Sequence, residues 1–195
     1  LPLCVNGNLF NVAAVIDRGE IAGIVPKTYL PTGAEFQEAR WFGTADDLTV
    51  TMVELFDDTV PIGADLLFRS KNDPDVVLGV ELCEDVWTPI PPSSFLAAAG
   101  ATVLVNLSAS NELVGKAQYR RDLITQQSGR CLAGYIYSSA GPGESTTDVV
   151  FGGHCLIAEN GALLAETKRF RMHGDLILCD LDVAGCVHDR LRTTS

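Results

Sequence analysis

The sequence has little positive charge. Its 14 Lys and Arg residues stand against 25 Asp and Glu residues, which gives a formal net charge of -11. An acidic chain of this kind is a poor match for nucleic acid or for an anionic membrane surface. It also has no apolar run that approaches the roughly 20 residues of a membrane-spanning helix. We therefore expect neither a nucleic-acid partner nor a membrane partner.

Pairs of metal-ligating residues are lacking as well. The six cysteines form no Cys-x-x-Cys pair, and the three histidines are scattered without ligand spacing. This pattern argues against a zinc site, so we expect no metal in this chain. Several cysteines, among them Cys155 and Cys179, lie in apolar runs. We interpret them as reduced core residues of a cytoplasmic protein.

The 195 residues contain no internal repeat and no low-complexity tract, and this length suits one domain with a sizeable core. Apolar runs on both sides of residues 17–20, and again on both sides of residues 160–161, predict two β-hairpins. Between the hairpins, strands are expected to alternate with helices over residues 76–82, 93–99, 101–105, 116 to about 132, and 134–138. This order predicts an α/β fold with a mixed sheet.

The chemically most informative stretch is residues 76–87. An apolar, β-branched run ends at Cys83, and Glu84, Asp85, Val86 and Trp87 follow. A thiol at the end of a buried strand, where backbone N–H groups can polarise it, has the position of a nucleophile. The alternative is a core cysteine, since free cysteines are often buried.

A second segment, residues 24–36, places Lys27 directly after an apolar strand and between two prolines. A partly buried lysine needs an anionic partner or a chemical purpose. The alternative is an exposed loop lysine. Neither segment alone shows whether its cysteine or its lysine has a chemical role, so the two segments must be considered together.

Taken together, the segments resemble the nitrilase superfamily, whose members use a Glu-Lys-Cys triad. The sequence is most similar to the glutaminase domains of glutamine-dependent NAD⁺ synthetases. The resemblance covers nearly the whole chain in the correct order, and it is carried by residues 25–31, 35–36, 40–42, 79–87, 106–110, 143–148 and 159–161. It implies a nitrilase-like α-β-β-α sandwich with mixed sheets.

The resemblance also implies a role for each matching residue. Cys83 would attack the side-chain amide of glutamine and form a thioester, and Lys27 would stabilise the oxyanion. Glu35 would hold either the lysine or the substrate. The remaining matches would line the glutamine pocket, and they are Glu84, Trp87 and Ser110.

The chain departs from the family pattern at three points. The family's catalytic glutamate lies several tens of residues before the lysine, and nothing before Lys27 matches it. Gly33 stands where the family has a tyrosine of the glutamine pocket. No Ser-Gly-Gly-x-Asp-Ser loop, which grips ATP in the synthetase half, occurs here. We therefore expect residues 1–195 to be part of a single glutaminase domain that is incomplete at its N-terminus, separate from the synthetase domain and inactive alone.

The predicted function is hydrolysis of glutamine to supply ammonia to a synthetase domain of the same polypeptide. That parent enzyme would use ATP, Mg²⁺ and deamido-NAD⁺ in the other domain, whereas no cofactor is expected in this chain. The resemblance also suggests a homo-oligomer. The alternatives are a nitrilase-type amidase acting on a free small amide, and a non-catalytic assembly module. Residues 143–148 favour the glutaminase over the other amidases, and Glu35 or Glu38 could replace the missing base.

Overall fold

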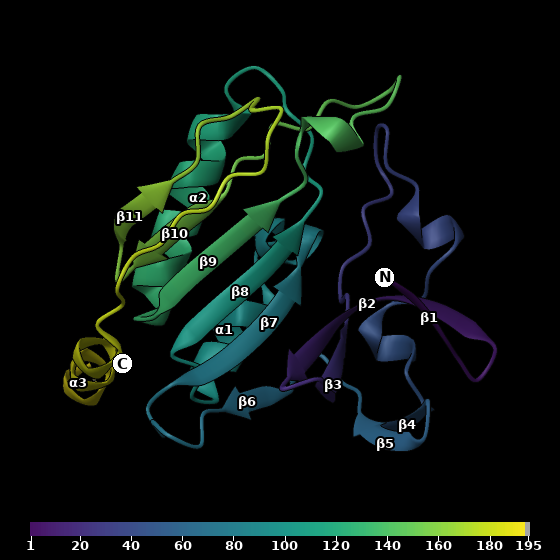
Figure 1. Ribbon diagram of the computed structural model, residues 1–195, viewed down its shortest axis with the longest axis horizontal. Coiled ribbons are helices and arrows are strands. Elements are labelled where there is room, and N and C mark those ends of the chain that lie inside the picture. Colours follow the sequence, from purple (N-terminus) through teal and green to yellow (C-terminus); the bar gives the residue numbers. More distant parts are fainter. Residues whose placement is uncertain (194–195) are drawn as a thin grey trace.

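The computed structural model describes residues 1–193, and a mixed sheet is at its centre (Figure 1). The strand order in this sheet is β11-β10-β9-β8-β7-β6. The strands β7, β8 and β9 run parallel, and the strands on both sides of them pair antiparallel. The bounds are β6 Leu67–Arg69, β7 Val77–Leu82, β8 Val103–Ser108, β9 Gly134–Ser139, β10 Leu156–Glu159 and β11 Ala162–Glu166. The predicted mixed sheet is confirmed.

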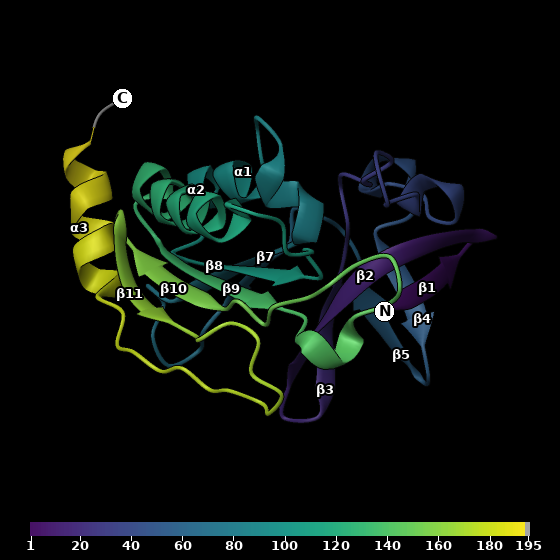
Figure 2. The ribbon, with the colours of Figure 1, turned by 90° about the horizontal axis from the view of Figure 1, so that it is seen from above.

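Two helices, α1 (Pro92–Ala98) and α2 (Lys116–Cys131), pack on one face of this sheet (Figure 2). They enclose the main core, which includes Leu96, Leu104, Ile124 and Tyr135. Both helices lie where the sequence predicts them. A short helix, α3 (Val183–Arg192), lies beside the β10–β11 end of the sheet (Figure 1).

The opposite face of the mixed sheet meets a smaller antiparallel sheet, which is formed by β1 (Pro2–Val5), β2 (Asn8–Asp17) and β3 (Glu20–Pro26). Ala13 and Val25 of the smaller sheet pack against Val80 and Leu82 of β7. The chain thus forms the α-β-β layers of the expected sandwich. This packing brings the end of β3 next to the end of β7, which positions the site described below.

Both predicted hairpins are present. The β10–β11 turn contains Asn160 and Gly161, with φ of 45° and 85°, and the backbone of Gly161 lies directly against Gly129 of α2. A Cβ on Gly129 would lie 3.0 Å from the Cα of Gly161, so any larger residue there would have to push the two backbones apart by a few tenths of an ångström. The β2–β3 turn repeats the left-handed pair, with φ of 52° and 88° at Arg18 and Gly19.

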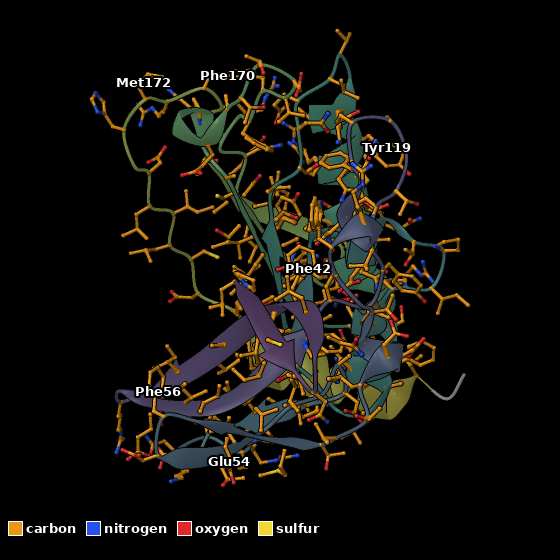
Figure 3. The ribbon with its side chains drawn as sticks, turned by 90° about the vertical axis from the view of Figure 1, so that its right-hand side faces the viewer. Phe42, Glu54, Phe56, Tyr119, Phe170 and Met172 are labelled. Carbon is orange, nitrogen blue, oxygen red and sulfur yellow. The ribbon has the colours of Figure 1, made fainter. Side chains whose placement is uncertain are left out.

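The remaining elements lie in the acidic stretch that showed little periodicity and in the loops. A third hairpin is formed by β4 (Met52–Leu55) and β5 (Asp58–Pro61), and Phe56 is exposed at its turn (Figure 3). Four short 3-10 turns are described within residues 1–193: η1 Glu38–Arg40, η2 Ala45–Asp47, η3 Cys83–Trp87 and η4 Pro142–Glu144. None of the described helices is long and apolar enough to cross a membrane.

The cysteine interpretation is only partly correct. All six cysteines carry free thiols. Cys131 and Cys186 are buried, but Cys4 and Cys179 are exposed. Residues 176–179, although apolar in sequence, form no strand in the structure. An apolar run in the sequence is therefore not sufficient to predict burial, because burial also requires another part of the fold to pack against the run.

Candidate active site

A cavity of about 770 Å³ opens at the edge of the sheet where the parallel strands β7, β8 and β9 end. The carboxyl ends of parallel strands meet at one edge, which is where α/β proteins commonly bind ligands. The end of β3 and the loop that follows it form the other wall. Cys83, Lys27 and Glu35 all line this cavity, together with Glu38 and Ser108. The structure therefore brings two distant segments of the sequence together.

Cys83 begins the turn η3 directly after β7, and its backbone is in the left-handed region with a φ of 47°. This conformation is uncommon for a residue with a side chain and requires support from its surroundings. Asn106 of β8 gives that support: its Oδ1 accepts from the Cys83 backbone N–H at 3.1 Å, and its Nδ2 donates to the Cys83 carbonyl at 3.4 Å. The thiol is consequently held at a sharp turn facing the cavity.

Lys27 follows the last residue of β3 and is only 3% exposed. Its ammonium group forms an ion pair with Oε2 of Glu38, and Oε1 of the same carboxylate accepts from Asn11 Nδ2 at 2.5 Å. A buried ammonium is stable only with such a partner, because desolvation of an unpaired charge is costly. The lysine is therefore a fixed positive charge in the cavity wall and is not an exposed loop residue.

Glu35 lies in the same loop but makes a different contact. Its Oε1 accepts from Asn111 Nδ2, and Oδ1 of Asn111 accepts from Lys116 Nζ at 2.5 Å. The side chain that holds Lys27 is thus Glu38, whereas Glu35 belongs to a second cluster around Asn111. Contact between Glu35 and a substrate stays a prediction.

Lys116 is a second cation near the cavity, and the sequence analysis did not identify it. Burial and the charge of Arg120 lower the pKa of Lys116, and Cys83, Glu35 and Glu112 partly oppose this shift. Lys116 Nζ lies 5.2 Å from the ring centroid of Trp87, which stacks on Tyr119. Lys116 is also the first residue of α2, where a positive charge opposes the helix dipole. That unfavourable placement is a signal that sequence reasoning could have used.

The other three predicted pocket residues lie on the same side as Lys116. Glu84, Trp87 and Ser110 are outside the lining of the 770 Å³ cavity among the described residues. Burial raises the pKa of Glu84, and the charges of Lys27 and Lys116 partly oppose this shift. Both lysines therefore favour the ionised form of Glu84. Ser110 is buried next to Asn111.

Chemically, the site combines a nucleophile with cations. A thiol can attack an electrophilic carbon, and a fixed ammonium can stabilise the negative charge that develops on an oxygen. Within residues 1–193 no group of three or more His, Cys, Asp or Glu side chains could hold a metal ion. The residues of the cavity fit acyl transfer through a cysteine.

The carbon-nitrogen hydrolase family model matches residues 4–190, and the chain belongs to this family. More particularly, it is similar to glutamine-dependent NAD(+) synthetases. It is 46% identical over 191 residues to that enzyme of Mycobacterium tuberculosis, covering 98% of this chain and 28% of the relative. It is 27% identical over 182 residues to the Homo sapiens enzyme, covering 88% of this chain and 25% of the relative.

Solved structures give the same result. A glutamine-dependent NAD(+) synthetase from Cytophaga hutchinsonii superposes with a TM-score of 0.75 at 29% identity, covering 87% of this chain and 27% of that one. A carbon-nitrogen hydrolase from Helicobacter pylori G27 gives a TM-score of 0.70 at 20% identity, covering 96% and 62%, and shows the fold alone. The nitrilase-like fold is confirmed. The chain spans about 28% of the length of the curated relatives with which it shares 46% identity.

Proposed function

We propose that this chain hydrolyses the side-chain amide of glutamine and supplies the released ammonia to an NAD⁺ synthetase domain of the same polypeptide. The observation that carries the proposal is the meeting of Cys83 and Lys27 in one cavity, from segments that are 56 positions apart in the sequence. The similarity to glutamine-dependent NAD(+) synthetases supports glutamine as the amide.

In the proposed reaction, Sγ of Cys83 attacks the amide carbon while Lys27 stabilises the oxyanion. A carboxylate takes the thiol proton and returns it to the departing nitrogen, so that ammonia leaves and a thioester forms. Water then attacks the thioester and releases glutamate and the thiol. Glu38 and Glu35 line the cavity, although each already accepts from another side chain. The family's upstream glutamate stays the predicted base.

The charges around the cavity suit a free amino acid. Glutamine carries an α-carboxylate and an α-ammonium besides its amide. Lys116 offers a cation to the carboxylate, and the half-buried Glu84 offers an anion to the ammonium. A simple aliphatic amide has neither group and would gain nothing from either charge. This pairing favours glutamine over a free small amide.

The test measures ammonia release from glutamine by the full polypeptide and by three variants. Cys83→Ala is expected to abolish release, and Lys27→Ala to reduce it by on the order of 10²–10³. Both variants keep synthesis driven by added ammonia, since neither residue belongs to the synthetase site. Cys155→Ala, which removes a half-buried thiol outside the cavity lining, is the control and retains both activities.

Other results point elsewhere. Hydrolysis of small aliphatic amides without hydrolysis of glutamine would favour a free-amide amidase. Loss of both activities in Lys27→Ala would make the lysine a structural residue. No amide hydrolysis by the full polypeptide would favour the assembly module.

A further inference from the structure

Asp85 is a buried carboxylate that the proposed reaction does not use. It lies two residues after Cys83 in the turn η3 and is 1% exposed. It is outside the lining of the cavity, so it is not a substrate contact. A carboxylate is almost never fully buried unless it is paired, so its partners indicate its role.

The partners are backbone N–H groups at the end of β7 and in the loop that follows β3. Oδ2 accepts from Leu82 at 2.9 Å, directly before Cys83 at the end of β7. Oδ1 accepts from Thr28 at 3.1 Å and from Tyr29 at 2.7 Å, the two residues that follow Lys27. One carboxylate thus binds the chain next to the nucleophile and the chain next to the lysine.

Little else of a polar kind joins these two strand ends. In the part of the chain that the structure describes, β3 pairs with β2 and β7 pairs with β6 and β8, so no strand pairing joins β3 to β7. Their contact is an apolar one through Val25, Val80 and Leu82. Apolar packing is non-directional and does not by itself fix the register of one strand end against the other. Hydrogen bonds to a carboxyl oxygen are directional, and they are about twice as strong when the group is ionised.

A local role in the turn does not explain all of these contacts. Stabilising η3 requires only the bond from Leu82, three residues earlier. The bonds from Thr28 and Tyr29 span 57 and 56 residues. Burial raises the pKa of Asp85 to about 7, while the N–H groups of Leu82 and Tyr29 lower it. The fold therefore keeps a costly group at the junction of the two sheets.

We propose that Asp85 is a positioning residue that sets the placement of Lys27 relative to Cys83. This inference rests on the proposed function, because it gives Asp85 an effect on the step in which these two side chains act. A displacement of about 1 Å in such a pair can cost on the order of 100-fold in rate.

The first test compares Asp85→Asn and Asp85→Glu in the full polypeptide. Asparagine keeps the size of the side chain, but its NH2 group would face backbone N–H groups that now donate to the carboxylate. We expect kcat for ammonia release from glutamine to fall on the order of 10- to 100-fold, with KM within about threefold because Asp85 does not touch the cavity. Glutamate keeps the charge and restores part of the loss. A rise in KM with kcat unchanged would overturn the proposal.

A matched control separates positioning from loss of stability. Asp182 also accepts a backbone N–H, from Gly185 at 2.8 Å, at the start of α3. Asp182→Ala removes this N-cap and is expected to lower the melting temperature while kcat stays within about twofold of wild type, since a lost cap costs only about 1 kcal/mol. An equal fall of kcat in both variants would show that Asp85 acts through stability alone.

The second test is a double-mutant cycle with Lys27→Gln. If Asp85 acts through the lysine, adding Asp85→Asn to Lys27→Gln changes kcat by no more than about twofold, whereas independent effects would multiply. Alkylation of Cys83 by chloroacetamide gives a readout that needs no turnover. If wild type fails to hydrolyse glutamine, the proposed function fails. The positioning role of Asp85 then stands if Asp85→Asn slows this alkylation about fivefold or more, because a displaced Lys27 no longer favours the Cys83 thiolate, and it falls if the rate stays within about twofold.

Discussion

Replacing Glu38 by glutamine is the most direct perturbation of the site. One oxygen of the Glu38 carboxylate accepts from the ammonium of Lys27, and the other accepts from Asn11 Nδ2. Glutamine keeps the size and one acceptor but presents an amide donor to one of these two donors. The result is a buried, uncompensated ammonium, because Lys27 is 3% exposed and Glu38 15% exposed. Removing one partner of a buried ion pair typically costs about 3–5 kcal/mol.

We expect Glu38→Gln to lower the free energy of unfolding by about 3 kcal/mol, the lower end of that range, because one acceptor remains. Urea unfolding measures it as a fall in the midpoint with an unchanged slope. A second variant, Glu38→Gln with Lys27→Met, is expected to recover stability to within about 1 kcal/mol of wild type, since no unpaired charge is left.

Glu35→Gln is the matched control, because Glu35 lines the same cavity but accepts only from Asn111 in the described contacts. Its expected cost is about 1 kcal/mol, and adding Lys27→Met to it rescues nothing. The reasoning would be refuted if Glu35→Gln proved the more destabilising variant, or if Lys27→Met rescued it and not Glu38→Gln.

Three further outcomes follow from particular contacts. Burial lowers the pKa of His154, although its hydrogen bond to Glu166 opposes this shift. The unfolded chain therefore binds a proton at higher pH than the folded chain, so the free energy of unfolding falls as the pH drops below about 6.5. In His154→Gln the slope of this free energy against pH is expected to shrink by up to about 1.4 kcal/mol per pH unit. Arg190 donates to the carbonyls of Ala101 at 2.6 Å and Cys131 at 2.8 Å, so Arg190→Leu is expected to lower stability by about 2–3 kcal/mol in urea unfolding. A glutamine-mimicking diazo-ketone is expected to label Cys83 quickly, and mass spectrometry that finds the label on Cys131 instead would contradict the proposed nucleophile.

Much of the fold could be predicted because its signals are local. The Asn160–Gly161 pair supplies two left-handed positions for a tight turn, and no distant contact is needed to recognise it. The apolar run ending at Leu82 and the helix that starts at Lys116 follow from composition and periodicity in the same way. The short strands β1, β4, β5 and β6 were not predicted, because three or four residues carry too little periodicity.

The site was predicted only in part. The residue types and their order pointed to Cys83 and Lys27, and the structure places both in one cavity. The partner of Lys27 could not be chosen from sequence, because Glu35 and Glu38 lie three residues apart in one loop. The turn η1, which begins at Glu38, turns that carboxylate toward the lysine, while Glu35 meets Asn111.

The sequence by itself determined the longer strands and the helices α1 and α2, and where each chemically active side chain lies along the chain, since these depend on neighbours within a few residues. Only the tertiary structure decided which side chains meet. Asp85 illustrates the difference, because its bonds to Thr28 and Tyr29 arise when two sheets pack face to face. That packing is driven by non-directional burial of apolar surface, which leaves no periodic pattern of paired residues in the sequence.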